Sequence, residues 1–245
     1  MTCLLYGIVF SDSRQRGRDP TPLVLPSGVG GAVVTLIEEG GLGAAISRID
    51  PADLTPNVAR VLAFAKVVEA LHAHRTVLPM RYGCLLGDEG QLVDLLRDHG
   101  AEYAAILQGL DGCVEMGVRV LLPAEVSVPR ALVESATRPA SGREYLIGRA
   151  ARTTRVEHFA RTLAAATERV LRVLGGLAER TKTDRSGTAN PHYASLDFLV
   201  KREVVTPFRR QFRWIERTES ARLLLSGPWP PYTFVVPAPS GNGRG

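Results

Sequence analysis

Histidine and cysteine are the residue types in this chain that would most directly indicate a zinc site. His72 and His74 lie two positions apart near the expected end of a helix, so their side chains point in different directions if the helix continues. No HExxH or CxxC spacing, which would bring ligands to one zinc ion, accompanies them. We therefore interpret both histidines as solvated or helix-terminal side chains, and we expect no metal and no other cofactor.

The glycines and carboxylates also lack a spacing that would support chemistry. Gly28, Gly30 and Gly31 form a glycine-rich stretch, but it fits neither GxGxxG nor GxxxxGK[ST], the patterns that cradle phosphates. The serines lie outside any nucleophile-elbow sequence. Asp50 and Asp53 are placed as capping or turn residues and not as an acid/base pair. We expect no catalytic residues and no enzyme activity.

Four residues are candidates for binding a partner. Arg81 and Glu115 each lie in the middle of a predicted strand, opposite in phase to its apolar face, where they could face a partner or form an ordinary ion pair across the sheet. Trp229 and Tyr232 lie in the proline-rich segment 227–236, which we expect to form a rigid strap over a domain. Their rings could cap a core or serve as contact points for a partner.

Composition indicates a globular protein. The chain has 245 residues, of which 45% are hydrophobic, and its mean hydropathy is +0.02. No apolar stretch approaches the ~20 residues that cross a bilayer, and the first ten residues resemble a strand and not a signal peptide. We expect a cytoplasmic protein. Cys3, Cys84 and Cys113 are odd in number and widely separated, which predicts reduced, buried thiols.

The basic charge does not point to nucleic acid. The formal net charge is +5, from 30 basic and 25 acidic side chains. Only Lys66, Lys182 and Lys201 are lysines, so most basic residues are arginines, and these are scattered among the acids. No ladder of arginines and aromatic rings, of the kind that binds single strands, is visible. We expect no nucleic-acid partner.

The first 122 residues predict an α+β domain. We expect a strand over 1–10, a hairpin of 32–37 and 42–47, a helix after Thr55-Pro56, a strand over 76–86, a helix from Asp88 to near Gly100, a second helix ending near Leu110, and a strand over 113–122. Apolar residues of the first helix that should face the core are Val58, Val61, Phe64, Ala65, Val68 and Leu71. This order predicts an elaborated ferredoxin-like sheet with helices on one face.

The remaining residues predict a second α+β domain over 141–236, after a linker over 123–140 and before a flexible tail over 237–245. Ser141 and Glu144 form a capping box that opens a long helix to about Gly175. Its apolar stripe could lie on its own sheet or form an intermolecular coiled coil. A small antiparallel sheet should follow, with a helix from Thr206 whose outward residues are Arg209, Arg210, Arg213 and Arg217.

Several ordered motifs closely resemble the gas vesicle protein F/L family (GvpF/GvpL), the accessory proteins of gas vesicle formation. The motifs are Val77–Gly83, Val114–Val120, Gly142–Leu146 and Gly227–Val236, and the resemblance runs from Leu5 to about Val236. It implies a non-enzymatic cytoplasmic protein that binds the small wall protein (GvpA-type) and other accessory proteins. One departure is that Phe64 and Ala65 stand where a His-Glu pair is frequent in the family.

An alternative of another class is a regulatory module that binds a small molecule or nucleic acid, because ferredoxin-like domains serve both purposes. Salt-sensitive binding to nucleic acid would favour it. For the accessory protein, we expect the sheet edge and the long helix to bind the partner.

Overall fold

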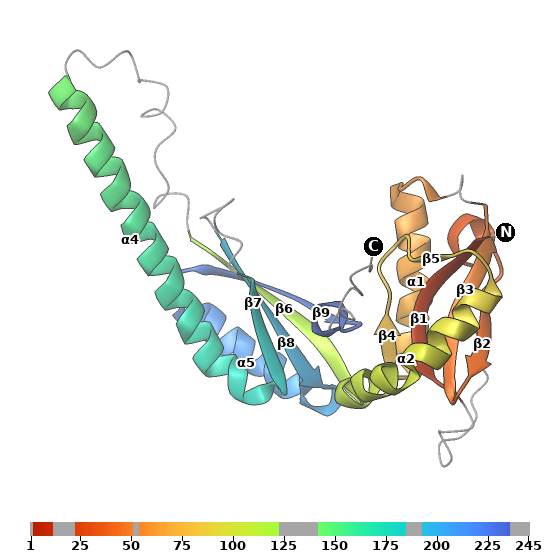
Figure 1. Cartoon of the computed structure of the whole chain (residues 1–245). Helices are drawn as coiled ribbons and strands as arrows, with labels where there is room; N and C mark the ends of the chain where they lie inside the picture. The colour runs from red at the N-terminus through yellow and green to blue at the C-terminus, as the bar shows by residue number, and fades with distance from the viewer. Residues whose placement is uncertain (1, 12–22, 51–53, 123–141, 185–192, 236–245) are drawn as a thin grey trace. The chain divides into compact units, whose positions relative to one another are not determined.

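The computed structural model describes residues 2–11, 23–50, 54–122, 142–184 and 193–235, and for 142–156 it describes the backbone of a helix alone (Figure 1). The chain divides into two compact units. Met1–Glu115 and Pro228–Gly245 form the first unit, and Met116–Gly227 form the second. The first unit is therefore discontinuous in sequence, because the second unit is inserted into it.

The described residues of the first unit form one antiparallel sheet and two α-helices (Figure 1). Its strands pair in the order β2-β3-β1-β4, and β5 also pairs with β1. The elements are β1 (Thr2–Phe10), β2 (Thr35–Glu39), β3 (Leu42–Ile49), α1 (Val58–His74), β4 (Val77–Pro79), β5 (Leu85–Leu86) and α2 (Glu89–Leu110). The predicted hairpin is confirmed: Gly40 and Gly41 connect β2 to β3 with φ of 59° and 83°, which favour glycine.

Strand β1 is buried on both sides, from Cys3 to Val9. Leu4 and Tyr6 pack in a cluster with α1 residues, whereas Leu5 and Ile8 pack with α2 residues. The prediction that helices cover one face is therefore wrong in this detail, although the α+β class is confirmed. The physical reason is that a strand with apolar residues on both faces needs cover on both.

Tyr6 brings a hydroxyl into this core and satisfies it there. The residue is fully buried, its hydroxyl lies 2.8 Å from Ser47 Oγ, and it accepts a hydrogen bond from the Val29 amide at 3.0 Å. Its ring stacks on Phe64 with centroids 4.9 Å apart. Burial is the main cause that raises the pKa of the phenol. Gly28 leaves the space that this hydroxyl needs, since a Cβ there would lie 2.1 Å from it.

Two predicted elements of the first unit have different limits. The strand predicted over 76–86 is two short strands, β4 and β5, separated by a turn in which Gly83 has φ of 89°. The two helices predicted on either side of Gly100 are one helix, α2. At helix α1, Asn57 is the capping residue, because its side chain accepts a hydrogen bond from the Arg60 amide at 2.9 Å.

The second unit contains a four-stranded sheet with the order β7-β8-β6-β9. Its elements are β6 (Cys113–Leu121), α4 (Gly142–Leu174), β7 (Arg180–Asp184), β8 (Tyr193–Lys201), α5 (Val205–Thr218) and β9 (Arg222–Trp229). This β-α-β-β-α-β order, with the first strand between the third and the fourth, is the ferredoxin-like arrangement. The ferredoxin-like arrangement, which we predicted for the first 122 residues, therefore belongs to the second unit and has β6 as its first strand.

This pairing changes the place of β6, which we assigned to the N-terminal domain. The strand itself is predicted correctly, but it pairs with β8 and β9. Alternation within a strand shows which residues are buried and not which strand is the neighbour. The compact units divide within β6 and within β9, whereas the predicted linker 123–140, the capping box of Ser141 and the tail 237–245 lie outside the described residues or their described side chains.

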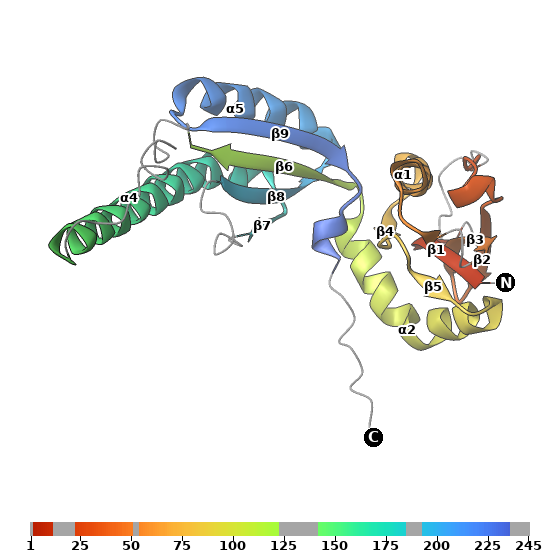
Figure 2. The same ribbon diagram turned by 90° about the horizontal axis from the view of Figure 1, so that it is seen from above.

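Helices α4 and α5 pack against the sheet of their own unit and against each other (Figure 2). In the described part of α4, Phe159, Ala166 and Val170 are buried, as the predicted stripe requires. The stripe thus serves its own unit. Helix α5 buries Phe208, Phe212 and Ile215, and the ring of Phe208 lies 5.3 Å from that of Phe198 in β8.

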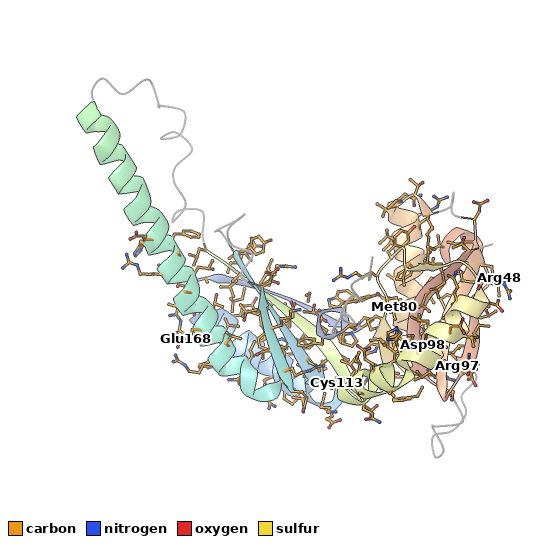
Figure 3. All side chains as sticks on the ribbon, in the orientation of Figure 1. Arg48, Met80, Arg97, Asp98, Cys113 and Glu168 are labelled. Atoms are coloured by element: carbon orange, nitrogen blue, oxygen red, sulfur yellow. The ribbon has the colours of Figure 1, made fainter. Side chains whose placement is uncertain are left out.

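One bidentate ion pair joins α4 to the end of α5. Arg169 Nε and Nη2 donate to the two carboxylate oxygens of Glu219 at 2.7 and 2.8 Å. The Glu219 side chain is 4% exposed, and the Arg169 side chain is 48% exposed. Hydrogen bonding from Arg169 is the main cause that lowers the pKa of Glu219. Arg172 and Glu168 form a second pair one turn further on, which is far more exposed. Figure 3 labels Glu168 on α4.

We expect Gly28→Ala to lower the free energy of unfolding by about 1–3 kcal/mol, because the added methyl meets the hydroxyl of a fully buried, stacked tyrosine. The control is Gly109→Ala in helix α2, where a Cβ meets nothing within 4 Å, and this change should stabilise the helix by up to about 1 kcal/mol. Chemical denaturation of both variants measures the effect. Equal stability of the two would contradict the proposed fit around Tyr6.

We expect Arg169→Met to lower the free energy of unfolding at pH 7 by about 1 kcal/mol, since the exposed guanidinium is partly screened by solvent. Because the folded-state pKa of Glu219 lies below its ordinary value of 4.5, the pair stabilises the protein above that value. This contribution is lost as the pH falls through the lowered pKa. Denaturation curves from pH 7 to acid check this, with Arg172→Met as a control that should change little at any pH.

Candidate functional site

The segment after β9 forms a strap on the first unit, as the prolines predict. A 3-10 turn spans Tyr232–Phe234, and the Tyr232 amide donates to the Pro230 carbonyl at 2.8 Å. Phe234 is 6% exposed, and Val235 packs against the cluster beneath α2. Proline rings fix the backbone before the turn, so the strap reaches the core of the first unit in one defined conformation.

Glu115 holds this strap. Its two carboxylate oxygens accept hydrogen bonds from the Thr233 amide and the Thr233 hydroxyl, both at 2.8 Å, and the residue is 8% exposed. A buried carboxylate is costly unless donors compensate it, and charge-assisted hydrogen bonds are stronger than neutral ones. The structure therefore gives Glu115, which we selected as a possible partner contact, a structural role.

Arg81 does not pair with Glu115. It is exposed in the turn between β4 and β5, and its carbonyl accepts a hydrogen bond from the Cys84 amide at 3.2 Å. Within the described residues its guanidinium forms no ion pair. The mid-strand position that we predicted is wrong, because β4 ends at Pro79. A partner contact for Arg81 stays a prediction.

Trp229 and Tyr232 are both partly exposed, at 46% and 39%. Burial is the main cause that raises the pKa of the Tyr232 phenol to about 12, and the carboxylates of Glu69 and Glu115 act in the same direction. The phenol is therefore protonated at neutral pH and can donate a hydrogen bond. The strap combines a buried anchor at Phe234 with two rings that a partner could reach.

The outer face of α1, defined by Val58, Val61 and Leu62, is a surface that the sequence interpretation missed. These side chains are 78%, 42% and 55% exposed, although we expected Val58 and Val61 to face the core. Phe64, Val67, Val68 and Leu71 fill the core side instead. The missed signal was Leu62, which is apolar but out of phase with the predicted stripe. Glu69, which influences Tyr232 electrostatically, lies further along the same helix.

The candidate metal and thiol groups are dispersed. In the parts of the chain that the structure describes, no group of three or more His, Cys, Asp or Glu residues could hold a metal ion. His72 and His74 lie in the last turn of α1, as predicted, with His72 buried. Cys3, Cys84 and Cys113 are free thiols. Burial raises the pKa of Cys84, which opposes formation of a reactive thiolate.

Polar residues of the second sheet are engaged with one another. Arg119 donates to Ser195 Oγ at 2.8 Å, and its guanidinium lies 5.7 Å from the centroid of the Tyr193 ring. Burial is the main cause that raises the pKa of Asp197. These contacts join β6 to β8 and stabilise the sheet.

None of the described helices is long and apolar enough to cross a membrane.

We expect Thr233→Val to loosen the strap, because it removes one of the two donors to Glu115. A hydrogen bond to a charged group contributes about 1.5–3 kcal/mol, so local opening should become at least about tenfold more frequent. Hydrogen–deuterium exchange of the amides over 232–235 measures this. Ser226→Ala, which removes a 3.4 Å contact to the Gly117 carbonyl, is the control, and equal exchange in both variants would rule out the anchoring role.

Known proteins match the chain over almost its whole length. The family model of the gas vesicle synthesis protein GvpL/GvpF matches residues 2–236. Gas vesicle protein F of Streptomyces sp. (strain CB03234) is 27% identical, with 96% of this chain and all of that protein covered. Gas vesicle protein L of the same organism is 29% identical, with 86% and 88% covered.

Solved structures agree on the fold. The crystal structure of the gas vesicle protein GvpF from Anabaena sp. PCC7120 matches with a TM-score of 0.72 and 22% identity, covering 97% of this chain and 99% of that one. The GvpF structure from Microcystis aeruginosa gives 0.71 at 17% identity, covering 96% and 99%. Since the family model spans nearly every residue, the chain belongs to the gas vesicle synthesis protein GvpL/GvpF family, which supports a role in gas vesicle formation.

Proposed function

We propose that this chain is a non-enzymatic accessory protein that binds the gas vesicle wall protein during assembly, through the outer face of α1. The observation that carries the proposal is the exposure of Val58, Val61 and Leu62 on a helix whose other side is fully used by the core. Their spacing of three and four residues is the one by which a helix docks its side chains against an apolar partner.

The physical need for such a surface follows from the wall protein. A small subunit with one strongly apolar face exposes that face to water until it joins the wall, and exposed apolar faces aggregate. A helix that offers aliphatic side chains can cover part of the face reversibly. Other gas vesicle accessory proteins are further partners under this proposal, and the places of action are the cytoplasm and the gas vesicle.

The separation of the titratable groups favours binding over catalysis. In the described residues His72 and His74 lie at the end of α1, and two other histidines lie in α2 and α4. Cys3 and Cys113 are buried in different strands. A catalytic site needs an acid, a base or a nucleophile that converge on one space. The hydrogen bonds of Glu115 with Thr233 and of Arg169 with Glu219 both hold the fold together.

We expect Val58→Ser combined with Leu62→Gln to reduce co-purification of the wall protein at least tenfold, because it removes most of the exposed aliphatic area of α1. The control is Val24→Ser combined with Val33→Ser, which alters two side chains that are 82% and 77% exposed on the same unit. Both pairs should leave the unfolding midpoint nearly unchanged.

The measurement is expression of a complete gas vesicle gene cluster with each variant, followed by affinity purification and by microscopy for refractile vesicles. The proposal predicts fewer vesicles and less bound wall protein for the α1 variant alone. Normal wall-protein binding by the α1 variant, with intact folding, would refute the α1 surface. Normal vesicles in cells without the gene would refute the function.

A further inference from the structure

We propose that helix α5 binds an acidic helical segment of a partner protein through an arginine face formed by Arg210, Arg213, Arg217 and Trp214. This face lies on the second unit and is separate in sequence from the outer face of α1. The proposal goes beyond the wall-protein function because it concerns another surface and a partner of different chemistry.

The three arginines lie directly opposite the buried side of α5. Phe208, Phe212 and Ile215 point into the second unit, while all three arginines are exposed. With 3.6 residues per turn, positions i, i+3 and i+7 fall within an arc of about 60° and extend over roughly 10 Å along the helix. The guanidinium groups therefore form one narrow row.

No carboxylate compensates this row within the part of the chain that the structure describes. Arg161, Arg169 and Arg172 of the neighbouring helix α4 each pair with a glutamate, and Arg209 donates to the Gly227 carbonyl. The three arginines of the face form no such ion pair there. Like charges spaced by three or four residues destabilise a helix by a few tenths of a kcal/mol per pair, so stability alone does not explain the row.

Trp214 adds an apolar contact to the same surface. It is 48% exposed and lies four residues after Arg210 and three before Arg217, which places it beside the row. Tryptophan and arginine are the residue types most enriched among side chains that dominate binding energy. A tryptophan ring left half in water next to three arginines is therefore suited to anchor a partner that also presents negative charge.

Carboxylates on a protein helix fit this surface better than the other anionic partners. The planar guanidinium matches a carboxylate in two parallel hydrogen bonds, and glutamates repeated by three, four and seven residues on a partner helix have the same spacing as the row. A membrane-bound amphipathic helix inserts its apolar face, but that face of α5 is buried on the sheet. Single-stranded nucleic acid needs several stacking rings, and the arginine face offers only the ring of Trp214.

The test uses the full chain and a labelled synthetic peptide. The probe is an alanine-rich helical peptide with glutamates at i, i+3 and i+7 and one leucine beside them, and its controls carry glutamine or lysine at the same positions. We expect binding of the glutamate peptide, measured by fluorescence anisotropy at low ionic strength, to weaken as salt rises. The glutamine peptide should bind at least tenfold more weakly.

The protein variants separate a specific row from general basic charge. The first triple variant carries Arg210→Glu, Arg213→Glu and Arg217→Glu. It should bind the glutamate peptide at least tenfold more weakly than the unchanged chain does, and it should bind the lysine peptide instead. The matched control reverses Arg161, Arg172 and Arg222, which are exposed on the same unit and give the same change of net charge, and it should keep binding. Trp214→Ala should weaken binding, and Trp214→Phe should restore most of it.

Three outcomes would overturn the proposal: equal loss in the two triple variants, absence of binding to the lysine peptide after charge reversal, or tighter binding to vesicles of anionic phospholipid or to single-stranded DNA than to the peptide. Val58→Ser with Leu62→Gln should leave peptide binding unchanged. Failure of the wall-protein proposal and failure of the arginine face are thereby distinguishable.

Discussion

The first unit depends on the burial of strand β1 between two helices. From Cys3 to Val9 every side chain of this strand is inside, so α1 and α2 must both be present for the sheet to be excluded from water. The Tyr6 hydroxyl is the one polar group that this arrangement places at the centre of β1, and Ser47 and the Val29 amide satisfy it. Position 28 requires glycine in this packing, because the Cβ of any other residue would clash with the Tyr6 hydroxyl.

The second unit is held together differently. Its helices cover one side of the sheet, and both apolar and ionic contacts hold them there. Phe198 and Phe208 join the sheet to α5, and Arg169 joins α4 to Glu219 at the end of α5. The ion pair of Arg169 and Glu219 lies where the two helices meet. The arginine row of α5 lies on the side of the helix opposite its buried residues, which is why we associate the row with a partner and not with the fold.

Much of the fold was predictable from the sequence, and the errors have a common physical cause. Periodicity correctly predicted the hairpin that turns at Gly40 and Gly41, the strand from Cys113 and the inward residues of α5, because each depends on a local pattern. It did not predict that the strand from Cys113 joins the second sheet or that Glu115 binds Thr233, since both contacts join residues far apart in sequence. The prediction that Val58 faces the core was wrong because α1 carries apolar residues on two sides, and only one of them is buried. The proline-rich strap was predicted, whereas the exposed α1 surface required the structure.

The insertion of one unit into the other sets an order of events during synthesis. Glu115 leaves the ribosome 118 residues before Thr233, an interval of roughly 6–24 s at common elongation rates. During that interval the second sheet can form, but the last piece of the first unit has not yet been translated. A nascent chain stalled anywhere before Phe234 therefore carries an unfinished core in its first unit, because the buried ring that closes this core has not yet been added.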